Sequence, residues 1–573
     1  MESLKDTNNN KGKKAKTILK VLFVILIFVR LWLLMTMNWR IEMDSFYDSR
    51  LEMGSALSLA GGGWMEQSYS KFVLCKGVSF PLFVAFSFLT RIPYPVCLFM
   101  LIVFAASLFV GAVKPFIAKD WIRKIIFIFL IYNPVGLGGE MAYPYRNALA
   151  PWLVLVIISC ILAIYIRRNN AIKKLLPWAA VLLLSTGFFW NLREDSMWFL
   201  PFIIVGPAVM FIHFILENKE KARNRIGFLI IALCPLISVF VWNTGISVMN
   251  NIKYGIYTTE DRTKTYEAKV LGKLIQIDDG ADLDGDYWVS EKAIELAKEV
   301  SPSFNSLNLE PFSQWPRIGD YSIWALRDSM ESSGFYIDAR TTNDMYKKIY
   351  DELDEAFREG RLNRKNGIQL SDTSGLYSVG EMINPIGIAF KSLINHVTYS
   401  EYEVNPEVVD HVKSEGDIVF YENMLNINLQ RTDEQLFDIG ADRKTIQSNA
   451  ALKMLLKVNR HISNLIIKCY NVISWILFIA SVAGFSWSIW LLFRRGKGTA
   501  YSLELVLFQI GLLLLVLLNA YLVGLWGTGF ELTADSGLFK AYTTPQTILI
   551  SCIEIIGTYL LVKNALNMLK YKK

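Results

Sequence analysis

Side chains suited to acid–base chemistry are concentrated in one polar segment near the N-terminus. Asp44 and Asp48 stand four residues apart, so they share one face if that stretch is helical, and Lys76 follows them. A carboxylate can take a proton from a substrate hydroxyl, and a lysine can bind an anionic leaving group. The segment therefore predicts a group-transfer site. The alternative is an ordinary polar loop with a solvated charge pair.

Two further polar segments carry charges between apolar stretches. Residues 133–152 contain Arg146, and the short sequence WNLREDSMW contains Arg193, Glu194 and Asp195. Because the second segment is only a few residues long, its charges must lie at the edge of the hydrocarbon. Charges in that position are costly and often functional. The alternative is that they pair with one another and reach toward the interface without a further role.

Each of these charges has an expected task if the segments meet. Lys76, Arg146 and Arg193 are candidate ligands of an anionic leaving group, since a developing negative charge needs fixed cations. Glu194 or Asp195 would orient an acceptor or a cation. Asp44 and Asp48 are both candidates for the general base.

The elements that must position these side chains are membrane helices. Of 573 residues, 53% are hydrophobic and only 19% are charged, and the apolar residues fall in long unbroken runs. A spanning helix needs about 20 mostly apolar residues. The predicted spans are ten, near 17–37, 96–113, 122–136, 148–166, 175–190, 197–216, 226–248, 467–493, 501–526 and 545–562. This pattern excludes a disordered chain, a disulfide scaffold and an ordinary cytosolic enzyme.

Basic residues in short loops predict the orientation of the spans. The tail, residues 1–16, contains five lysines, and every second connection after it is also basic. Both termini are therefore expected in the cytoplasm, in a multi-pass protein of the cell membrane. No small-x-small cleavage site follows the first apolar segment, so that segment is expected to remain as a span.

Two large polar pieces are then expected outside the cell. One is a first loop, residues 38–94, within an N-terminal membrane module of residues 17–245. The other is residues 246–460, with 24 Lys+Arg and 35 Asp+Glu; residues 461–573 return to the membrane. Since the long polar stretch is acidic and the membrane part is basic, no nucleic-acid partner is expected.

The acidic stretch 246–460 mixes helix and strand patterns and predicts an α/β domain. Asp344–Arg361 repeats apolar residues at helical spacing, and Ser290 is a candidate cap of a helix that follows it. Gly416–Phe420 is predicted to form a short strand. The expected fold class is thus a mainly α polytopic membrane protein with an extracytoplasmic α/β domain.

Cysteine and histidine are too scattered to suggest a cofactor. The chain has six cysteines with no Cys-x-x-Cys pair, and its four histidines are far apart. No metal site or disulfide framework is supported by these spacings. We expect no cofactor, and a divalent metal has no support.

The first loop resembles that of the GT-C superfamily of membrane glycosyltransferases, which use polyprenyl-phosphate-linked sugars. The residues that carry the resemblance are Asp48-Ser49, Gly63-Trp64, Tyr69, Lys76-Gly77 and Pro81-Leu82-Phe83. In addition, Arg193-Glu194-Asp195 resembles the second acidic motif and Tyr145-Arg146-Asn147 an outer-loop motif. The resemblance covers roughly the first 250 residues. Ser49 stands where a second aspartate is common, which argues against a metal held by an aspartate pair.

The resemblance implies transfer of a sugar from a polyprenyl-phosphate donor, with inversion, to a cell-wall or surface glycan. It implies Asp48, which matches the acidic motif, as the preferred general base ahead of Asp44, and Lys76, Arg146 and Arg193 as ligands of the donor phosphate. The expected partners are this lipid-linked donor, a glycan or glycopolymer acceptor and the lipid bilayer. The WWDYG motif of oligosaccharyltransferases is absent, which disfavours transfer to protein asparagine. Two alternatives stay open: a transporter or flippase of a lipid-linked glycan precursor, and a receptor or assembly scaffold.

Overall fold

Long apolar helices form most of the chain. The computed structural model describes residues 2–41, 47–66, 68–217, 222–280, 288–399, 402, 404, 415–495, 502–530 and 532–571. Nine helices of this described part are long and apolar enough to cross a membrane. They are α1 (Glu2–Met35), α4 (Tyr94–Val113), α6 (Ala150–Ile166), α7 (Ile172–Trp190), α8 (Leu200–Glu217), α9 (Ala222–Tyr254), α19 (Arg443–Arg495), α20 (Ser502–Trp526) and α21 (Gly537–Tyr571). The chain is therefore a mainly helical, multi-pass membrane protein.

The predicted third span, residues 122–136, is not a spanning helix. It forms α5 (Asp120–Ile131), a helix of 12 residues that is followed by short 3₁₀ turns at η1 (Pro134–Gly136) and η2 (Gly139–Ala142). Pro134 explains the early end, because a proline disfavours helical backbone at the residue before it. Nine of the ten predicted spans are thus single long helices in the described part of the chain.

The segment after α4 nevertheless follows α1 over much of its length. The rings of Phe127 and Phe23 are 5.6 Å apart, and the Arg30 Nε donates to the carbonyl of Ile131 over 2.5 Å. Farther along, the Arg40 amide donates to the carbonyl of Ala142 over 2.8 Å. Helix and turns together therefore carry the chain to the end of α1 at which the first loop begins.

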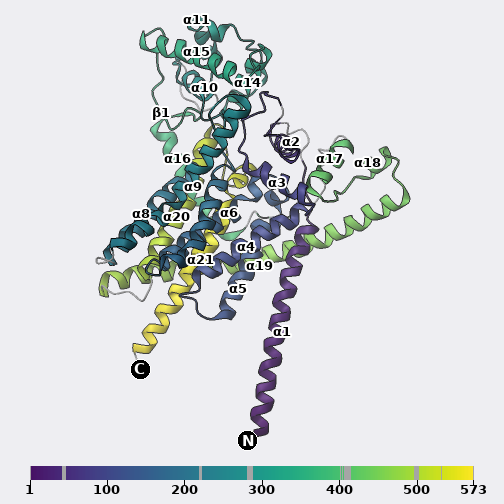
Figure 1. Ribbon diagram of the computed structural model, residues 1–573, viewed down its shortest axis with the longest axis vertical. Helices are drawn as coiled ribbons and strands as arrows, with labels where there is room; N and C mark the ends of the chain where they lie inside the picture. Colours follow the sequence, from purple (N-terminus) through teal and green to yellow (C-terminus); the bar gives the residue numbers. More distant parts are fainter. Residues whose placement is uncertain are drawn as a thin grey trace.

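Residues 255–378, which we call the head, lie at one end of the long helices, and both ends of the chain lie at the other (Figure 1). The head contains α10 (Tyr266–Gln276), α11 (Glu291–Val300), α12 (Pro302–Asn305), α13 (Pro311–Gln314), α14 (Gly319–Ser332) and α15 (Ala339–Arg358). Ser290 caps α11 as predicted, since its hydroxyl accepts from the Ala293 amide over 3.0 Å. The helix predicted from residue 344 is α15.

The predicted α/β character of this region is not found in the described residues. Its two strands, β1 (Ile368–Gln369) and β2 (Leu376–Tyr377), form one short antiparallel pair. The predicted strand Gly416–Phe420 lies inside the helix α17 (Glu415–Leu425). Five residues of a GDIVF pattern fit either state, and here the helix packs against the first loop.

The first loop consists largely of two helices, α2 (Ser49–Ala60) and α3 (Ser79–Thr90). The apolar α3 has 12 residues, which is too short to cross a bilayer, as expected. Leu51 and Cys75 of the loop belong to the same hydrophobic core as the helices of the head. Loop and head are therefore one packed unit.

A buried arginine joins the head to the first loop. Arg327 is fully buried, and its Nη1 donates to Asp261 over 2.8 Å and to Glu267 over 2.7 Å. Its Nε donates to the carbonyl of Lys71 over 2.8 Å, and its Nη2 to that of Val73 over 3.2 Å. Because a buried guanidinium is costly to leave unpaired, these bonds fix the loop against the head.

Not all of residues 246–460 belong to the head. The helix α16 (Val379–Thr398) packs along α20, where the Tyr521 hydroxyl donates to the Met382 carbonyl over 3.0 Å. The helices α17 and α18 (Asp433–Asp438) then lead into the long α19. On α19, the hydroxyl of Ser474 donates to the buried Glu554 of α21, which supplies a partner that the sequence could not name.

Candidate active site

Asp48 lies just before α2 and is held by two hydrogen-bond donors. Lys76 Nζ donates to its Oδ1 over 2.6 Å, and the Tyr145 hydroxyl donates to the same oxygen over 2.8 Å. The lysine side chain is 4% exposed, whereas that of Asp48 is 48% exposed. Oδ2 has no hydrogen-bond partner among the described residues. One carboxylate oxygen is thus fixed, and the other remains open.

The surroundings of Asp48 keep it ionised. Burial alone would raise the pKa of this carboxyl, but the charge and hydrogen bond of Lys76 outweigh burial and hold the pKa well below its usual range. Arg146 and the Tyr145 hydroxyl act in the same direction. Asp48 is therefore an anion at neutral pH.

Arg146 connects the first loop to the second acidic motif. Its Nη1 donates to both carboxylate oxygens of Glu194, over 2.8 and 2.6 Å. Glu194 Oε1 also accepts from the Gly77 amide over 3.2 Å. Burial would raise the pKa of Glu194, but Arg146 and then Lys76 lower it to about 2. This pair is an ion pair at all physiological pH values.

Arg193 uses its whole guanidinium fork. Nε and Nη2 donate to the two oxygens of Asp195, over 2.8 and 2.6 Å, and Nη1 donates to Asn147. The guanidinium also lies over the Tyr542 ring, 4.3 Å from its centroid. Two parallel bonds and a stacked ring fix the orientation of this cation.

The predicted motif Tyr145-Arg146-Asn147 is the hub of the arrangement. Its three consecutive side chains bind Asp48, Glu194 and Arg193 respectively. Arg146 and Asn147 begin the 3₁₀ turn η3 (Arg146–Ala148), which leads directly into α6. The structure thus brings together Asp48, Lys76, Arg146, Arg193, Glu194 and Asp195; Asp44 lies outside the described residues.

Glu52 is a member of this cluster that the sequence did not single out. It lies one helical turn after Asp48, is fully buried and is 3.8 Å from Arg146 Nε. Neither of its oxygens has a hydrogen-bond partner in the described part of the chain. Burial raises the pKa of Glu52 to about 8, against the opposing charges of Arg146 and Lys76. Its spacing of four from Asp48 was the only signal in the sequence.

A glycine allows the first loop to approach the second acidic motif. The Ser79 amide donates to the Asn191 carbonyl over 3.2 Å, and a Cβ on Gly77 would lie 2.2 Å from that same oxygen. A side chain at position 77 would therefore push the loop away from Glu194. The Lys76-Gly77 pair of the motif serves packing as well as charge.

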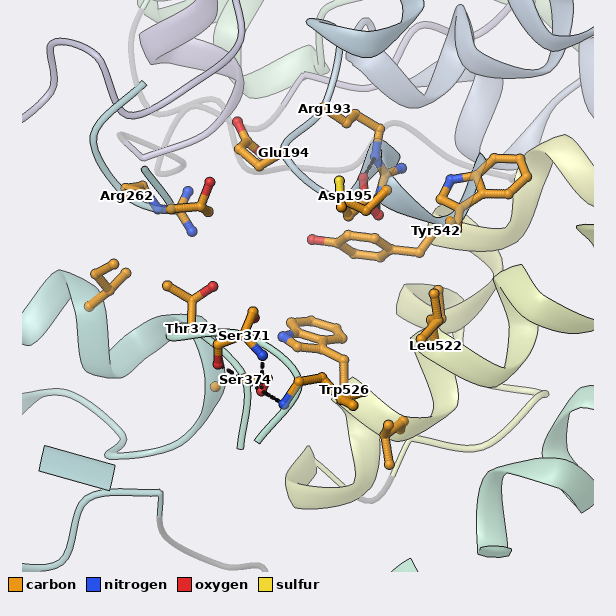
Figure 2. Close-up of a pocket in the computed structure, with 18 of the residues that line it drawn as sticks. Arg193, Glu194, Asp195, Arg262, Ser371, Thr373, Ser374, Leu522, Trp526 and Tyr542 are labelled. Carbon is orange, nitrogen blue, oxygen red and sulfur yellow. Dashed lines mark hydrogen bonds and ion pairs between the residues drawn. The ribbon is translucent and has the colours of Figure 1, made fainter. Parts of the chain in front are cut away.

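A cavity of ≈ 430 Å³ lies between the head and the ends of the long helices. Its volume is within the usual range of small-molecule sites, about 300–1,000 Å³. Arg146, Arg193, Glu194 and Asp195 line it, whereas Asp48 and Lys76 do not. The opposite side is formed by the head. Figure 2 shows residues from both sides, among them Arg193, Glu194, Asp195, Arg262, Ser371, Thr373, Ser374, Trp526 and Tyr542.

Several lining residues of this cavity were not predicted. Arg262 and Lys264 come from the head, and Trp526 and Tyr542 come from the facing ends of α20 and α21. The two aromatic rings are 5.2 Å apart. Neither pair lies in a motif with characteristic spacing, so only the tertiary structure could place them beside Arg193.

A possible metal-ligand group lies far from this site along the chain. His213, Glu217 and Glu504 place one ligand atom each within 4.8 Å of one another. However, Arg168 already donates to Glu217 over 2.5 Å and to Glu504 over 2.8 Å. The arrangement is accounted for by ion pairing, since the guanidinium neutralises both carboxylates.

No family model, no curated protein and no solved structure matches this chain.

Proposed function

We propose that the chain is an inverting membrane glycosyltransferase that transfers a sugar from a polyprenyl-phosphate donor to a cell-wall or surface glycan. The observation that carries this proposal is the carboxylate of Asp48. Lys76 and Tyr145 hold its Oδ1, its Oδ2 has no hydrogen-bond partner among the described residues, and the side chain is 48% exposed. An oriented, ionised carboxylate that an incoming hydroxyl can reach is what a general base requires.

The reaction needs one base and a stabilised leaving group. The acceptor hydroxyl oxygen forms a bond with the anomeric carbon while the bond from that carbon to the phosphate oxygen breaks. The hydroxyl proton goes to Oδ2 of Asp48, and the electron pair goes to the departing phosphate. Arg193 and Arg146 face the cavity and are the cations for that phosphate.

The contacts suggest refined roles for two of the expected residues. Lys76 is bound to Asp48 and does not line the cavity, so we assign it to positioning the base rather than to binding phosphate. Glu194 holds Arg146 in a bidentate pair, so we assign it to orienting that cation. Asp195 does the same for Arg193.

We place the head outside the cell and both termini in the cytoplasm. This assignment rests on the basic residues of alternate loops and of the N-terminal tail. The lipid donor would then meet the charged cluster at the outer face of the bilayer. A transporter of a lipid-linked precursor would instead need a site near the middle of the membrane that opens to both sides. The charged cluster at the head end favours the transferase.

Two experiments test the proposed function. In the first, the purified chain in lipid nanodiscs receives a radiolabelled polyprenyl-phosphate sugar, and release of polyprenyl phosphate is measured with envelope glycan present. The proposal is supported if the wild-type chain releases polyprenyl phosphate and the Asp48→Asn variant does not. It is contradicted if the wild-type chain leaves the donor intact. In the second, mass spectrometry compares surface glycans with and without the protein; identical glycans would contradict it.

A further inference from the structure

The cavity beside Arg193 has two walls of different origin. Tyr542, Trp526 and Arg193 come from the long helices and their connections, and Arg262 and Lys264 come from the head. Figure 2 shows Arg262 facing the side of the cavity that carries Tyr542. A ligand in this space would touch both parts of the protein at once.

The aromatic wall suits a sugar ring. Trp526 and Tyr542 have centroids 5.2 Å apart and an angle of 40° between their planes, and both side chains are partly exposed. The C–H groups on the face of a pyranose can pack against such rings. Tryptophan and tyrosine suit this contact because their rings are largely apolar and each has one polar group at its edge. On the facing side, Ser371 and Thr373 offer hydroxyl groups without hydrogen-bond partners among the described residues.

The charges of the cavity do not balance. Its described lining has four cations, Arg146, Arg193, Arg262 and Lys264, and two carboxylates, those of Glu194 and Asp195, which leaves a net charge of +2 (4 − 2). The carboxylates pair with Arg146 and Arg193. The other two cations of the lining, Arg262 and Lys264, come from the head.

Lys264 is the exposed one of these two head cations. It has no ion pair within the described part of the chain. The two carboxyls nearest in sequence, those of Asp261 and Glu267, accept hydrogen bonds from Arg327. The next, that of Glu260, accepts hydrogen bonds from the amide and hydroxyl of Thr263, and none of the three lines the cavity. An exposed lysine at a half-enclosed aromatic site is suited to an anionic group on the ligand.

We propose that the head makes this cavity a binding site for an anionic acceptor glycan, one that bears a phosphate or carboxylate group. The sugar ring packs on Trp526 and Tyr542, and its anionic group binds Lys264 and Arg262. That the ligand is the acceptor of a sugar transfer rests on the proposed function. The donor phosphate is tethered to the bilayer and binds Arg193, which belongs to the helix ends.

Binding of two small probes tests the proposal. Glucose 6-phosphate and glucose are compared by saturation-transfer NMR with the full chain in nanodiscs of uncharged lipid. A charge-assisted hydrogen bond is worth about tenfold or more in affinity. Glucose 6-phosphate is therefore expected to bind at least about tenfold more tightly than glucose, and Lys264→Glu is expected to remove most of that difference.

A matched control separates the cavity from the general charge of the head. Lys292 is also an exposed lysine of the head but does not line the cavity, so Lys292→Glu should leave both probes unaffected. Equal binding of the two probes to the unaltered chain overturns the proposal. So does an equal effect of the two substitutions.

The donor is the second possible source of a phosphate, and competition distinguishes it. If polyprenyl phosphate displaces glucose 6-phosphate, and if Lys264→Glu also weakens the binding of polyprenyl phosphate, the head binds the donor and the acceptor assignment is wrong. Failure of the proposed function has a different signature: the chain would not consume a polyprenyl-phosphate sugar, yet glucose 6-phosphate would still bind in a Lys264-dependent way.

Discussion

At the scale of single residues, the two oxygens of Asp48 have different tasks. Oδ1 is bound by Lys76 and Tyr145, and Oδ2 is left to accept a proton. Asp48→Asn keeps the size of the side chain but removes the base. We expect transfer to fall by a factor of about 10² to 10⁴, measured in vesicles with saturating lipid donor.

The control for Asp48→Asn has two parts. Asp44→Asn should have a milder effect, since Asp48 is the preferred base. Thermal unfolding is measured in parallel, because the buried Lys76 ammonium loses its carboxylate in Asp48→Asn. A folded Asp48→Asn variant with the wild-type rate would rule out the mechanism.

Arg193 should not tolerate lysine. Its guanidinium makes two bonds to Asp195 and one to Asn147 and stacks on Tyr542, and a single ammonium group cannot reproduce this fork. We expect Arg193→Lys to lose activity although the charge is kept, as measured by release of polyprenyl phosphate. Arg358→Lys, at an arginine that is 70% exposed, should have no effect. Near-normal turnover of Arg193→Lys would remove this residue from the site.

Glu52 should make stability depend on pH. Burial raises its pKa to about 8, against about 4.3 in an unfolded chain. Between these two values the folded protein keeps a proton that the unfolded chain has released, so stability falls as pH rises through this window. Glu52→Gln imitates the protonated form and should remove that loss.

The measurement for Glu52→Gln is thermal unfolding at pH 5 and pH 9. The difference in unfolding temperature between Glu52→Gln and wild type should be more favourable to the variant at pH 9 than at pH 5. An identical difference between the two proteins at both pH values would show that the buried carboxyl does not titrate in this window.

At the scale of elements, the close approach of Gly77 to Asn191, the residue after α7, controls how the loop meets the second acidic motif. In Gly77→Ala, a Cβ would lie 2.2 Å from a backbone oxygen of Asn191, and backbone cannot rotate away as a side chain can. We expect a loss of about 1–3 kcal/mol in unfolding free energy, together with lower turnover because the bond from the Gly77 amide to Glu194 is displaced.

A second glycine of the same loop supplies the comparison. Gly54 lies in α2, and no atom lies within 4 Å of an added Cβ there. Gly54→Ala should therefore be neutral or stabilise the protein by up to about 1 kcal/mol, because alanine is the better helix former. If both alanine variants unfold alike, the close contact at Gly77 is not important for stability.

The elements that the sequence predicted well are those set by local pattern. Apolar length located the nine long helices, and a single serine marked the start of α11. The error at residues 122–136 arose because hydropathy ignores backbone geometry, whereas Asn133, the residue before Pro134, has a non-helical backbone (φ −52°, ψ 133°). The fold of residues 246–460 was harder, since α16 packs on α20 through contacts that only the tertiary structure creates.

The candidate site also contains residues that the local sequence could identify and residues that it could not. The motif residues around Asp48, Lys76 and Arg193 could be named because they stand in short segments beside apolar runs. Arg262 and Lys264 could not, because they are two cations in an acidic stretch and only the docking of the head brings them to the cavity. Residues that act through a partner in another part of the chain leave no local pattern.

At the scale of the whole molecule, topology is the property most easily tested. We expect Arg168 and Asn343 on opposite sides of the membrane, because the first lies in a basic connection and the second in the head. Reporter fusions at these two positions measure it. The same side for both would contradict the orientation proposed for the head.

The docking of the head has a consequence for how the protein is made. Val73 and Arg327, which are joined by a hydrogen bond, are 254 positions apart in the sequence. At about 5–20 residues synthesised per second, the first loop waits roughly 13 to 50 s for its partner to leave the ribosome. Until then Cys75, which is fully buried in the finished protein, has no head to cover it. The interval during synthesis is therefore the period in which this thiol is open to oxidation.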